Sequence, residues 1–232
     1  MLSSASAGRR LLRGLTSIVA LVALAAAAVG CGGGSSSNGI ASKPAAEILA
    51  ASRAAALAAS SVHLHTTSGE VVLDMKLSST GGGGKLTLAG ATLEMLRAGN
   101  AVYLKAPTAL YQKIGINAKV PPDTWLKLSV SAIPQLAAFT EMREQLNRLL
   151  NLSAVTKGPT ATLEGQKVVE LQQKLKVFTR SLYVAATGKP YPLELLLKGQ
   201  VAGKTTLTEW DKPVTLAPPS KSITPEVSKN AR

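Results

Sequence analysis

Few side chains in this chain of 232 residues have types and spacing suited to chemistry. The single cysteine, Cys31, cannot form an internal disulfide, and no histidine or acid lies near it in sequence to act as a base or as a second zinc ligand. The two histidines, His63 and His65, alternate along one predicted strand and could supply part of a metal site. No cysteine or pair of acids accompanies them, so we expect two solvated histidines and no bound metal.

The acidic residues do not form a catalytic pair either. Glu141 and Glu144 are spaced to share one face of a predicted helix, as surface charges often are. Asp123 and Asp211 lie beside prolines and tryptophans in predicted turns, where a structural role is the default. A hydrolase needs a nucleophile with its base or a pair of acids, and a metal enzyme needs a ligand cluster. The sequence therefore predicts no catalysis and no cofactor.

The residues before Cys31 have the features of an export signal. Three arginines between residues 9 and 13 form a positive start, residues 15–29 form an uncharged apolar segment, and small residues follow. A segment of about 15 residues is short of the roughly 20 that a permanent membrane-spanning helix needs. Residues 1–30 are thus predicted to be a cleaved signal, and an uncleaved anchor is the alternative.

The sequence Ala28-Val29-Gly30-Cys31 resembles the bacterial lipobox, in which a diacylglycerol is attached to the cysteine sulfur and the signal is cleaved just before it. It departs from that pattern at Ala28, where the lipobox prefers leucine; an ordinary secretory signal is the alternative. The resemblance implies that Cys31 carries lipid, with fatty acids such as palmitate, on the extracytoplasmic side of the cell membrane. Each buried methylene contributes about 0.8 kcal/mol, so two or three acyl chains hold a protein on a membrane where one does not.

Charge and composition limit the partners of the mature chain. The full chain has 26 basic and 13 acidic residues, and loss of the three signal arginines leaves a net charge near +10. Such a charge favours anionic lipid headgroups or cell-wall polymers, while export argues against nucleic acid as a partner. The lysines are scattered and aromatic residues make up only 3% of the chain, so we expect solvated strand faces around an aliphatic interior.

About 200 mature residues fit one domain. Residues 31–43, rich in glycine and serine, predict a flexible tether, residues 44–219 the folded domain, and residues 220–232 a loose tail.

Two helices and about ten strands are predicted within the folded domain. An alanine-rich helix of about 16 residues begins at Pro44, and a second helix begins at Pro134 and extends to about residue 150. Elsewhere apolar and polar residues alternate with a period of two. Residues 81–84, four glycines, are expected to form a loop, and they lack the lysine of a phosphate-binding loop. The prediction is an α+β fold: a strongly curved antiparallel sheet, an incomplete barrel, with helices covering its concave face.

This order of signal, helix, strands, helix and strands resembles the actinobacterial LppX/LprG-type lipoproteins, whose fold is similar to that of the periplasmic lipoprotein carrier LolA. The segments that carry the resemblance are SVHLHTTSGEV, AVYLKAP, SLYVAATGKPYPLEL and TEWDKPVTLAPP. They mark strands and turns and contain no catalytic signature. The resemblance implies an apolar cavity between sheet and helices that takes the acyl chains of a lipid or glycolipid. It also implies an envelope transporter as a partner of this carrier.

The residues expected to line that cavity are aliphatic or aromatic residues on the predicted inner face and on the second helix: Val71, Leu73, Met75, Leu93, Met95, Val102, Leu104, Phe139, Met142, Leu146, Leu195 and Leu197. Sixteen buried methylenes at about 0.8 kcal/mol each would provide on the order of 12 kcal/mol before chain ordering and association are subtracted. The alternative is that the same residues pack tightly and leave no hollow. The protein would then be a membrane-tethered interaction or scaffold module with a solid core.

Overall fold

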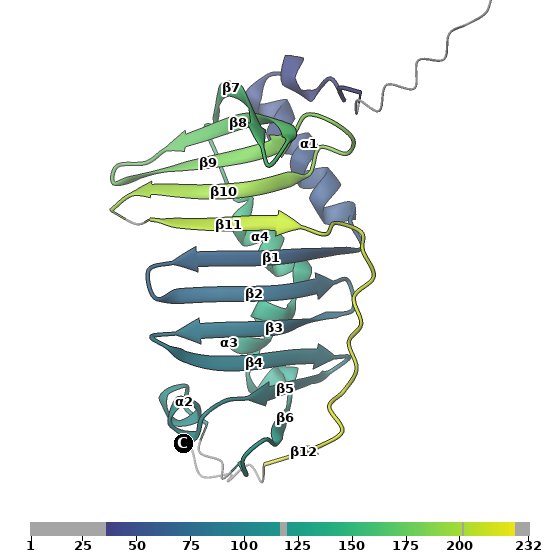
Figure 1. Ribbon diagram of the computed structural model, residues 1–232, viewed down its shortest axis with the longest axis vertical. Helices are drawn as coiled ribbons and strands as arrows, with labels where there is room; N and C mark the ends of the chain where they lie inside the picture. The colour runs from purple at the N-terminus through teal and green to yellow at the C-terminus, as the bar shows by residue number, and fades with distance from the viewer. Residues whose placement is uncertain (1–35, 117–119, 201, 226–232) are drawn as a thin grey trace, which may run out of the picture. The chain divides into compact units, whose positions relative to one another are not determined.

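Twelve strands form one sheet in the computed structural model, which describes residues 36–116, 120–200 and 202–225. The order across the sheet is β12-β6-β5-β4-β3-β2-β1-β11-β10-β9-β8-β7 (Figure 1). The strands are β1 (Ser61–Ser68), β2 (Val71–Ser78), β3 (Gly81–Leu88), β4 (Ala91–Ala98), β5 (Ala101–Lys105), β6 (Trp125–Ser129), β7 (Thr156–Leu163), β8 (Gln166–Lys174), β9 (Phe178–Ala185), β10 (Pro192–Gly199), β11 (Gly203–Thr208) and β12 (Ser222–Ile223).

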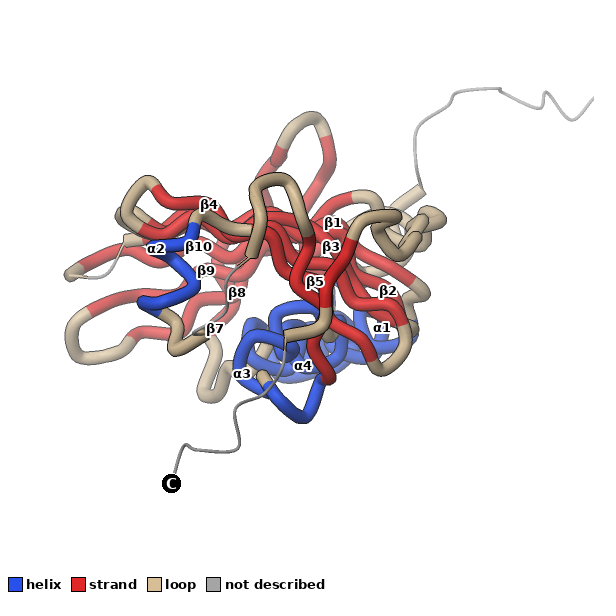
Figure 2. Tube along the Cα trace, turned by 90° about the horizontal axis from the view of Figure 1, so that it is seen from below, coloured by secondary structure: helices blue, strands red, loops and turns tan. Residues whose placement is uncertain are grey.

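Neighbouring strands are antiparallel except for β12, which runs parallel to β6. The sheet ends at β12 and β7, so it is not closed into a barrel, and Figure 2 shows its curvature. The predicted curved, open, antiparallel sheet is confirmed.

Helices cover one face of the sheet, which we call the inner face (Figures 1 and 2). They are α1 (Ala45–Ala58), α3 (Pro134–Ala137) and α4 (Met142–Leu149), with the short helices η2 (Val130–Ala132) and η3 (Ala138–Thr140) beside them and η1 (Ile40–Ser42) before α1. A further helix, α2 (Thr108–Lys113), follows β5 and was not predicted.

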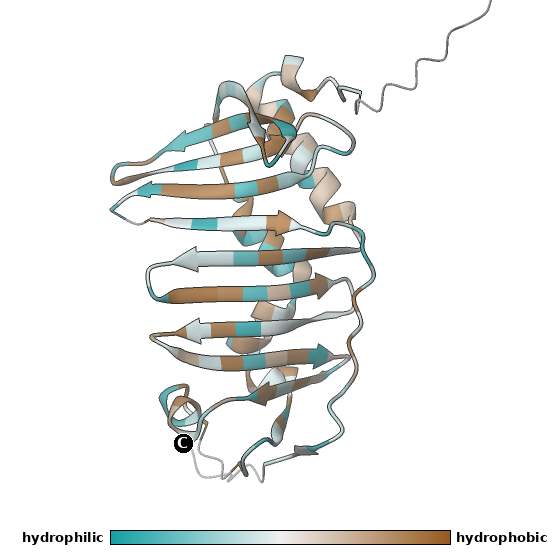
Figure 3. Cartoon of the chain, in the orientation of Figure 1, coloured by the Kyte–Doolittle hydropathy of each residue, from teal (hydrophilic) through white to brown (hydrophobic). Residues whose placement is uncertain are grey.

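A row of residues that pair across the strands forms the centre of the core. Leu64 of β1 pairs with Met75, and the row continues through Gly84, Met95 and Leu104. The four side chains are at most 1% exposed. Alternation of apolar and polar residues along each strand, visible in Figure 3, places these side chains on the inner face because successive side chains in a strand point to opposite faces.

The four glycines at residues 81–84 form the first half of β3, so the expected loop is wrong. Close packing explains their type. A Cβ atom on Gly84 would overlap the backbone carbonyl of Asp74, and one on Gly82 would lie 2.9 Å from the carbonyl oxygen of Thr140. Gly82 therefore lets η3 approach the sheet, and Gly84 lets β2 lie close to β3.

The second predicted helix is interrupted at that contact. Glu141 has extended backbone angles (φ −104°, ψ 108°), which separate η3 from α4. The hydroxyl of Thr140 donates a hydrogen bond to the carbonyl of Ala137, and the side-chain amide of Gln145 donates to the carbonyl of Ala138. These bonds satisfy backbone groups that a continuous helix would use internally.

Some residues of both ends that were predicted to be flexible make defined contacts. Ser37 forms a β-bridge with Thr187, the Asn38 side chain donates to the carbonyls of Ala185 and Gly188, and Ile40 is buried, so the tether does not extend to residue 43. Residues 222–223 pair with β6, which corrects the loose tail from residue 220. The signal of residues 1–30 and Cys31 lie outside the described residues. The described core extends from Ile40 to Leu207, so a fragment of residues 36–232 contains all of it.

Candidate functional site

The inner face is closely packed at nine of the twelve positions predicted to line a cavity. These side chains are at most 6% exposed: Leu73, Met75, Leu93, Met95, Val102, Leu104, Met142, Leu146 and Leu195. A cavity wide enough to admit water would leave accessible surface on its walls. In this conformation the nine residues therefore form a packed core between sheet and helices.

The three other predicted residues are more accessible. Val71 is 37% exposed, and Phe139 and Leu197 are partly buried against the core. Val71 and Leu197 belong to a second row of inner-face residues, four positions along the strands from the central row. Leu197 pairs with Gly203, Val71 pairs with Leu88, and Leu88 pairs with Ala91.

We call Leu197, Gly203, Ser68, Val71, Leu88 and Ala91 the apolar rim. Ser68 pairs with Val71, and a Cβ atom on Gly203 would lie 3.1 Å from the Cβ of Ser68, so the row is continuous across the strands. Val71 is exposed and the others are half-buried. The inner face thus passes from a closed core to an accessible apolar edge without an intervening charged residue on these strands.

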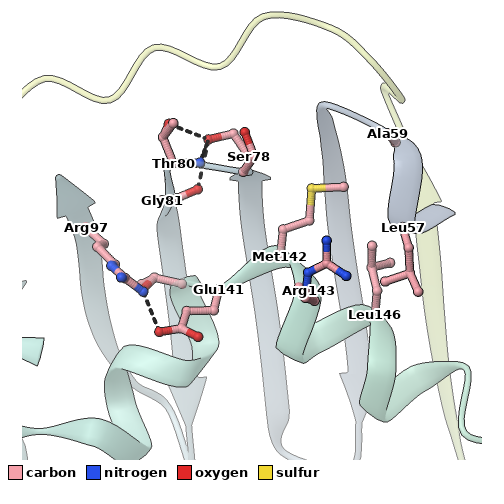
Figure 4. Close-up of a pocket in the computed structure, with 12 residues that line it drawn as sticks. Leu57, Ala59, Ser78, Thr80, Gly81, Arg97, Glu141, Met142, Arg143 and Leu146 are labelled. Atoms are coloured by element: carbon pink, nitrogen blue, oxygen red, sulfur yellow. Dashed lines mark hydrogen bonds and ion pairs between the residues drawn. The ribbon is translucent and has the colours of Figure 1, made fainter. Parts of the chain in front are cut away.

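A cleft lies at the opposite ends of the strands, between the end of α1, the β2–β3 turn and the start of α4 (Figure 4). Its volume is about 270 Å³. Leu57, Met142 and Leu146 border its apolar side. Met142 and Leu146 are two of the nine packed residues and expose at most 5% of their surface, so the cleft lies at the margin of the packed core. Pockets for small molecules usually measure about 300–1,000 Å³, and this cleft could hold only part of a long acyl chain.

The polar side of this cleft contains an ion pair between Arg97 of β4 and Glu141 (Figure 4). The hydroxyls of Ser78 and Thr80 lie at the same opening, 3.2 Å from each other. Arg143 is exposed and has no ion pair among the described residues. The cleft thus has an apolar side and an opposite side with arginines and hydroxyls. This combination suits a ligand with both apolar and anionic or polar parts.

Arg180 fastens the other end of α4 to the sheet, a role that the sequence analysis missed. Its guanidinium donates to the carbonyls of Leu149 at 2.7 Å and Asn151 at 2.8 Å. Burial lowers the pKa of Arg180, but an arginine remains charged at neutral pH. An arginine two residues from Leu182 on an alternating strand is a signal that could have identified it, because that spacing places it on the apolar face.

The two histidines lie on the outer face and contact one carboxylate. The Nε2 atom of His63 is 2.8 Å from Asp74, and Nδ1 of His65 is 3.3 Å from its other oxygen. Burial raises the pKa of Asp74, but hydrogen bonds and charge from His63 and His65 lower it by more. The prediction of two merely solvated histidines is therefore incomplete, because both side chains contact Asp74. Within the described ranges no group of three or more His, Cys, Asp or Glu side chains is arranged to hold a metal ion.

The acidic residues considered above make separate structural contacts. Glu141 pairs with Arg97, Glu144 pairs with Arg148 at 2.8 Å, and Asp211 binds Lys189 at 2.8 Å. Asp123 is 88% exposed and lies 3.9 Å from Lys105. The structure does not bring these carboxylates together into one site.

Comparison with known proteins identifies the fold. No family model matches the chain, and no curated protein matches it in sequence. Among solved structures, LprF from Mycobacterium bovis is similar with a TM-score of 0.55 and 14% identity, covering 75% of this chain and 96% of LprF. The Mycobacterium tuberculosis lipoprotein LppX is similar with a TM-score of 0.50 and 14% identity, covering 74% of this chain and 99% of LppX. The resemblance to LppX/LprG-type lipoproteins is thus confirmed for the fold. Among the described helices, each is too short or too polar to cross a bilayer.

Proposed function

We propose that this protein is an envelope lipoprotein, anchored through Cys31 on the extracytoplasmic side of the membrane, that binds the acyl chains of a lipid or glycolipid and carries or presents them across the envelope. The observation that carries this proposal is the apolar rim, a mainly aliphatic row with Val71 exposed and its other members half-buried, at the edge of a buried and mainly aliphatic face. An acyl chain has no hydrogen-bonding groups, so it suits a surface that has no free side-chain polar group. The one hydroxyl of the apolar rim, on Ser68, already donates to the carbonyl of Ala202. We propose no catalytic role and no cofactor.

Binding of a whole chain requires the packed interior to open. The segment α3–η3–α4 is the part of the cover best suited to move, because its backbone is already interrupted at Glu141. Two polar contacts hold this segment in addition to the packing of Met142 and Leu146: the Arg97–Glu141 ion pair at the start of α4 and the Arg180 hydrogen bonds at its end. In the proposed mechanism the chain enters along the apolar rim and separates α4 from the sheet. An envelope transporter is the kind of partner that would load or unload it.

The second candidate is a membrane-tethered interaction or scaffold module. The packing of nine predicted cavity residues favours it, since a solid core needs no cargo. The two functions differ in whether the folded domain binds lipid in stoichiometric amounts.

The test is native mass spectrometry of residues 36–232, produced in bacteria, followed by analysis of extracted lipid. We expect one bound acyl lipid per protein, and we expect Leu197→Asp to reduce the bound fraction. The matched control is Leu196→Asp on the same strand, because Leu196 is also half-buried and points to the outer face. Leu195 is less suitable, since it is 2% exposed and a charge there would unfold the core.

A protein without lipid that also fails to bind fluorescent fatty acids and phospholipids would overturn the carrier proposal. Equal loss of lipid in the Leu196 and Leu197 variants would show that the rim is not the entry site.

A further inference from the structure

The turn between β8 and β9 exposes two large apolar side chains. Leu175 is 44% exposed and Val177 is 48% exposed. Lys174 and Lys176 alternate with them and are also exposed. A soluble surface usually carries such residues singly, and four alternating aliphatic and basic residues at the tip of a hairpin form an amphipathic projection.

The neighbouring hairpin supports this projection. The backbone N–H of Leu175 donates to the carbonyl of Phe178 at 2.9 Å, which closes the turn. The N–H of Gln200, in the β10–β11 turn, donates to the carbonyl of Val177 at 3.1 Å. The second turn brings the exposed Lys198 to the same edge of the sheet.

The charge of this edge is positive. Lys174, Lys176 and Lys198 make no ion pair with the described residues, and residues 174–178 and 198–200 include no acid. The next turn along this edge of the sheet, between β1 and β2, contains one acidic residue, Glu70. We refer to Lys174, Leu175, Lys176, Val177 and Lys198 as the basic tip.

We propose that the basic tip docks on an anionic lipid bilayer, with Leu175 and Val177 entering the headgroup region and the three lysines contacting lipid phosphates. Lysines next to an anionic membrane are attracted to its surface potential, and aliphatic side chains add affinity by leaving water. The composition favours a bilayer over a protein partner. Protein interfaces are depleted in lysine and rely on tryptophan, tyrosine and arginine, which the tip lacks.

This contact would be separate from the anchor at Cys31 and would orient the domain. Lys198 of the tip follows Leu197 of the apolar rim directly in β10, so both features lie at the same edge of the sheet. A docked tip would bring the rim toward the membrane surface. The docking itself does not depend on the proposed cargo.

The experiment is sedimentation of residues 36–232, which lack Cys31, with phosphatidylcholine vesicles that do or do not contain about one third phosphatidylglycerol. We expect binding only to the anionic vesicles, weakened by salt. The double variants Leu175→Ser/Val177→Ser and Lys174→Glu/Lys176→Glu should each lower the partition constant by roughly tenfold or more. The matched control is Lys113→Glu/Lys127→Glu, which makes the same charge change at exposed positions near the β6 end of the sheet.

Three outcomes would overturn the proposal. The unaltered fragment could fail to bind, the control variant could lose as much vesicle binding as the tip variants, or Leu175→Ser/Val177→Ser could leave the partition constant unchanged. The last result would instead indicate a general attraction to acidic polymers, which soluble polyglutamate would then reproduce. Far-ultraviolet circular dichroism of each variant checks that it is folded. Lipid found by mass spectrometry in a fragment that fails to dock would leave the carrier proposal intact.

Discussion

Tyr191 and Trp210 stack face to face, with ring centroids 4.5 Å apart and planes 6° from parallel. The Tyr191 hydroxyl donates a hydrogen bond to Asp211 at 2.6 Å, and Lys189 donates to the same carboxylate oxygen at 2.8 Å. The other oxygen of Asp211 accepts the backbone N–H of Ser60 at 2.9 Å. This cluster joins two of the segments that carry the family resemblance, GKPYPLEL and TEWDKP, to the start of β1.

Stability should depend on pH through Asp211. Hydrogen bonds from Lys189, Tyr191 and the Ser60 backbone hold the pKa of Asp211 well below its usual value of 3.8. A group with a lowered pKa stabilises the folded state above its unfolded pKa, and that contribution disappears as pH falls through the folded value. We expect Asp211→Asn to lower the melting temperature at pH 7 and to have a progressively smaller effect below about pH 4. A melting-temperature difference that stays constant from pH 7 to pH 3 would contradict this assignment.

The aromatic stack should contribute more than the burial of its two rings. A double-mutant cycle with Tyr191→Leu and Trp210→Leu should give a coupling free energy of about 0.5–1.5 kcal/mol by urea unfolding. Because the Tyr191 hydroxyl also binds Asp211, the cycle should be repeated with Tyr191→Phe, which keeps the ring. Additive effects in the ring-deleting cycle would mean that the stack has no energy of its own.

Close packing at β3 predicts different costs at adjacent glycines. Gly84→Ala places a methyl group against the rigid carbonyl of Asp74, while Gly83→Ala meets a movable Leu96 side chain at 2.9 Å. Overpacking typically costs about 1–3 kcal/mol, so Gly84→Ala should destabilise the fold by at least that amount and Gly83→Ala by less. Chemical denaturation of both variants measures the difference, and equal stabilities would argue against the tight approach of β2 and β3.

Arg180 should contribute more to stability than an arginine on the surface. Arg180→Lys loses the paired geometry toward the carbonyls of Leu149 and Asn151, and we expect a cost of about 1–2 kcal/mol for this half-buried group. Arg148→Lys, on the exposed Glu144 ion pair, is the control and should change stability by less than about 0.5 kcal/mol. Faster hydrogen exchange of the α4 amides in the Arg180 variant would connect this contact to opening of the helix. Similar costs for the two variants would refute the proposed fastening.

Replacement of Cys31 by alanine should release the full-length protein from membranes washed with high salt. Loss of the sulfur removes the attachment point for acyl chains, and the salt wash screens contacts made by the basic tip. Cell fractionation followed by immunoblotting measures the distribution, with the unaltered protein as control. Retention of the alanine variant in the washed membrane fraction would show that Cys31 is not the anchor.

Local residue patterns were enough to predict much of the architecture. Period-two alternation around Leu64 and Met75 indicates strands with one apolar face. This is an effect between near neighbours in sequence. The same information predicted helices from Pro44 and Pro134, although it did not predict the interruption at Glu141.

Contacts between distant residues decided the remaining features. The four glycines at residues 81–84 are typical of a loop when only the sequence is considered. The close approach of the carbonyls of Asp74 and Thr140, which the sequence does not reveal, explains why glycines occupy a strand. Likewise, an aliphatic face cannot by itself indicate whether it packs or encloses a hollow, since both arrangements bury the same residues. In the tertiary structure nine of the proposed cavity residues are packed, and Val71 in the apolar rim is accessible. The sequence could not decide this, because how closely the helices approach the sheet depends on the three-dimensional positions of residues that are distant in sequence.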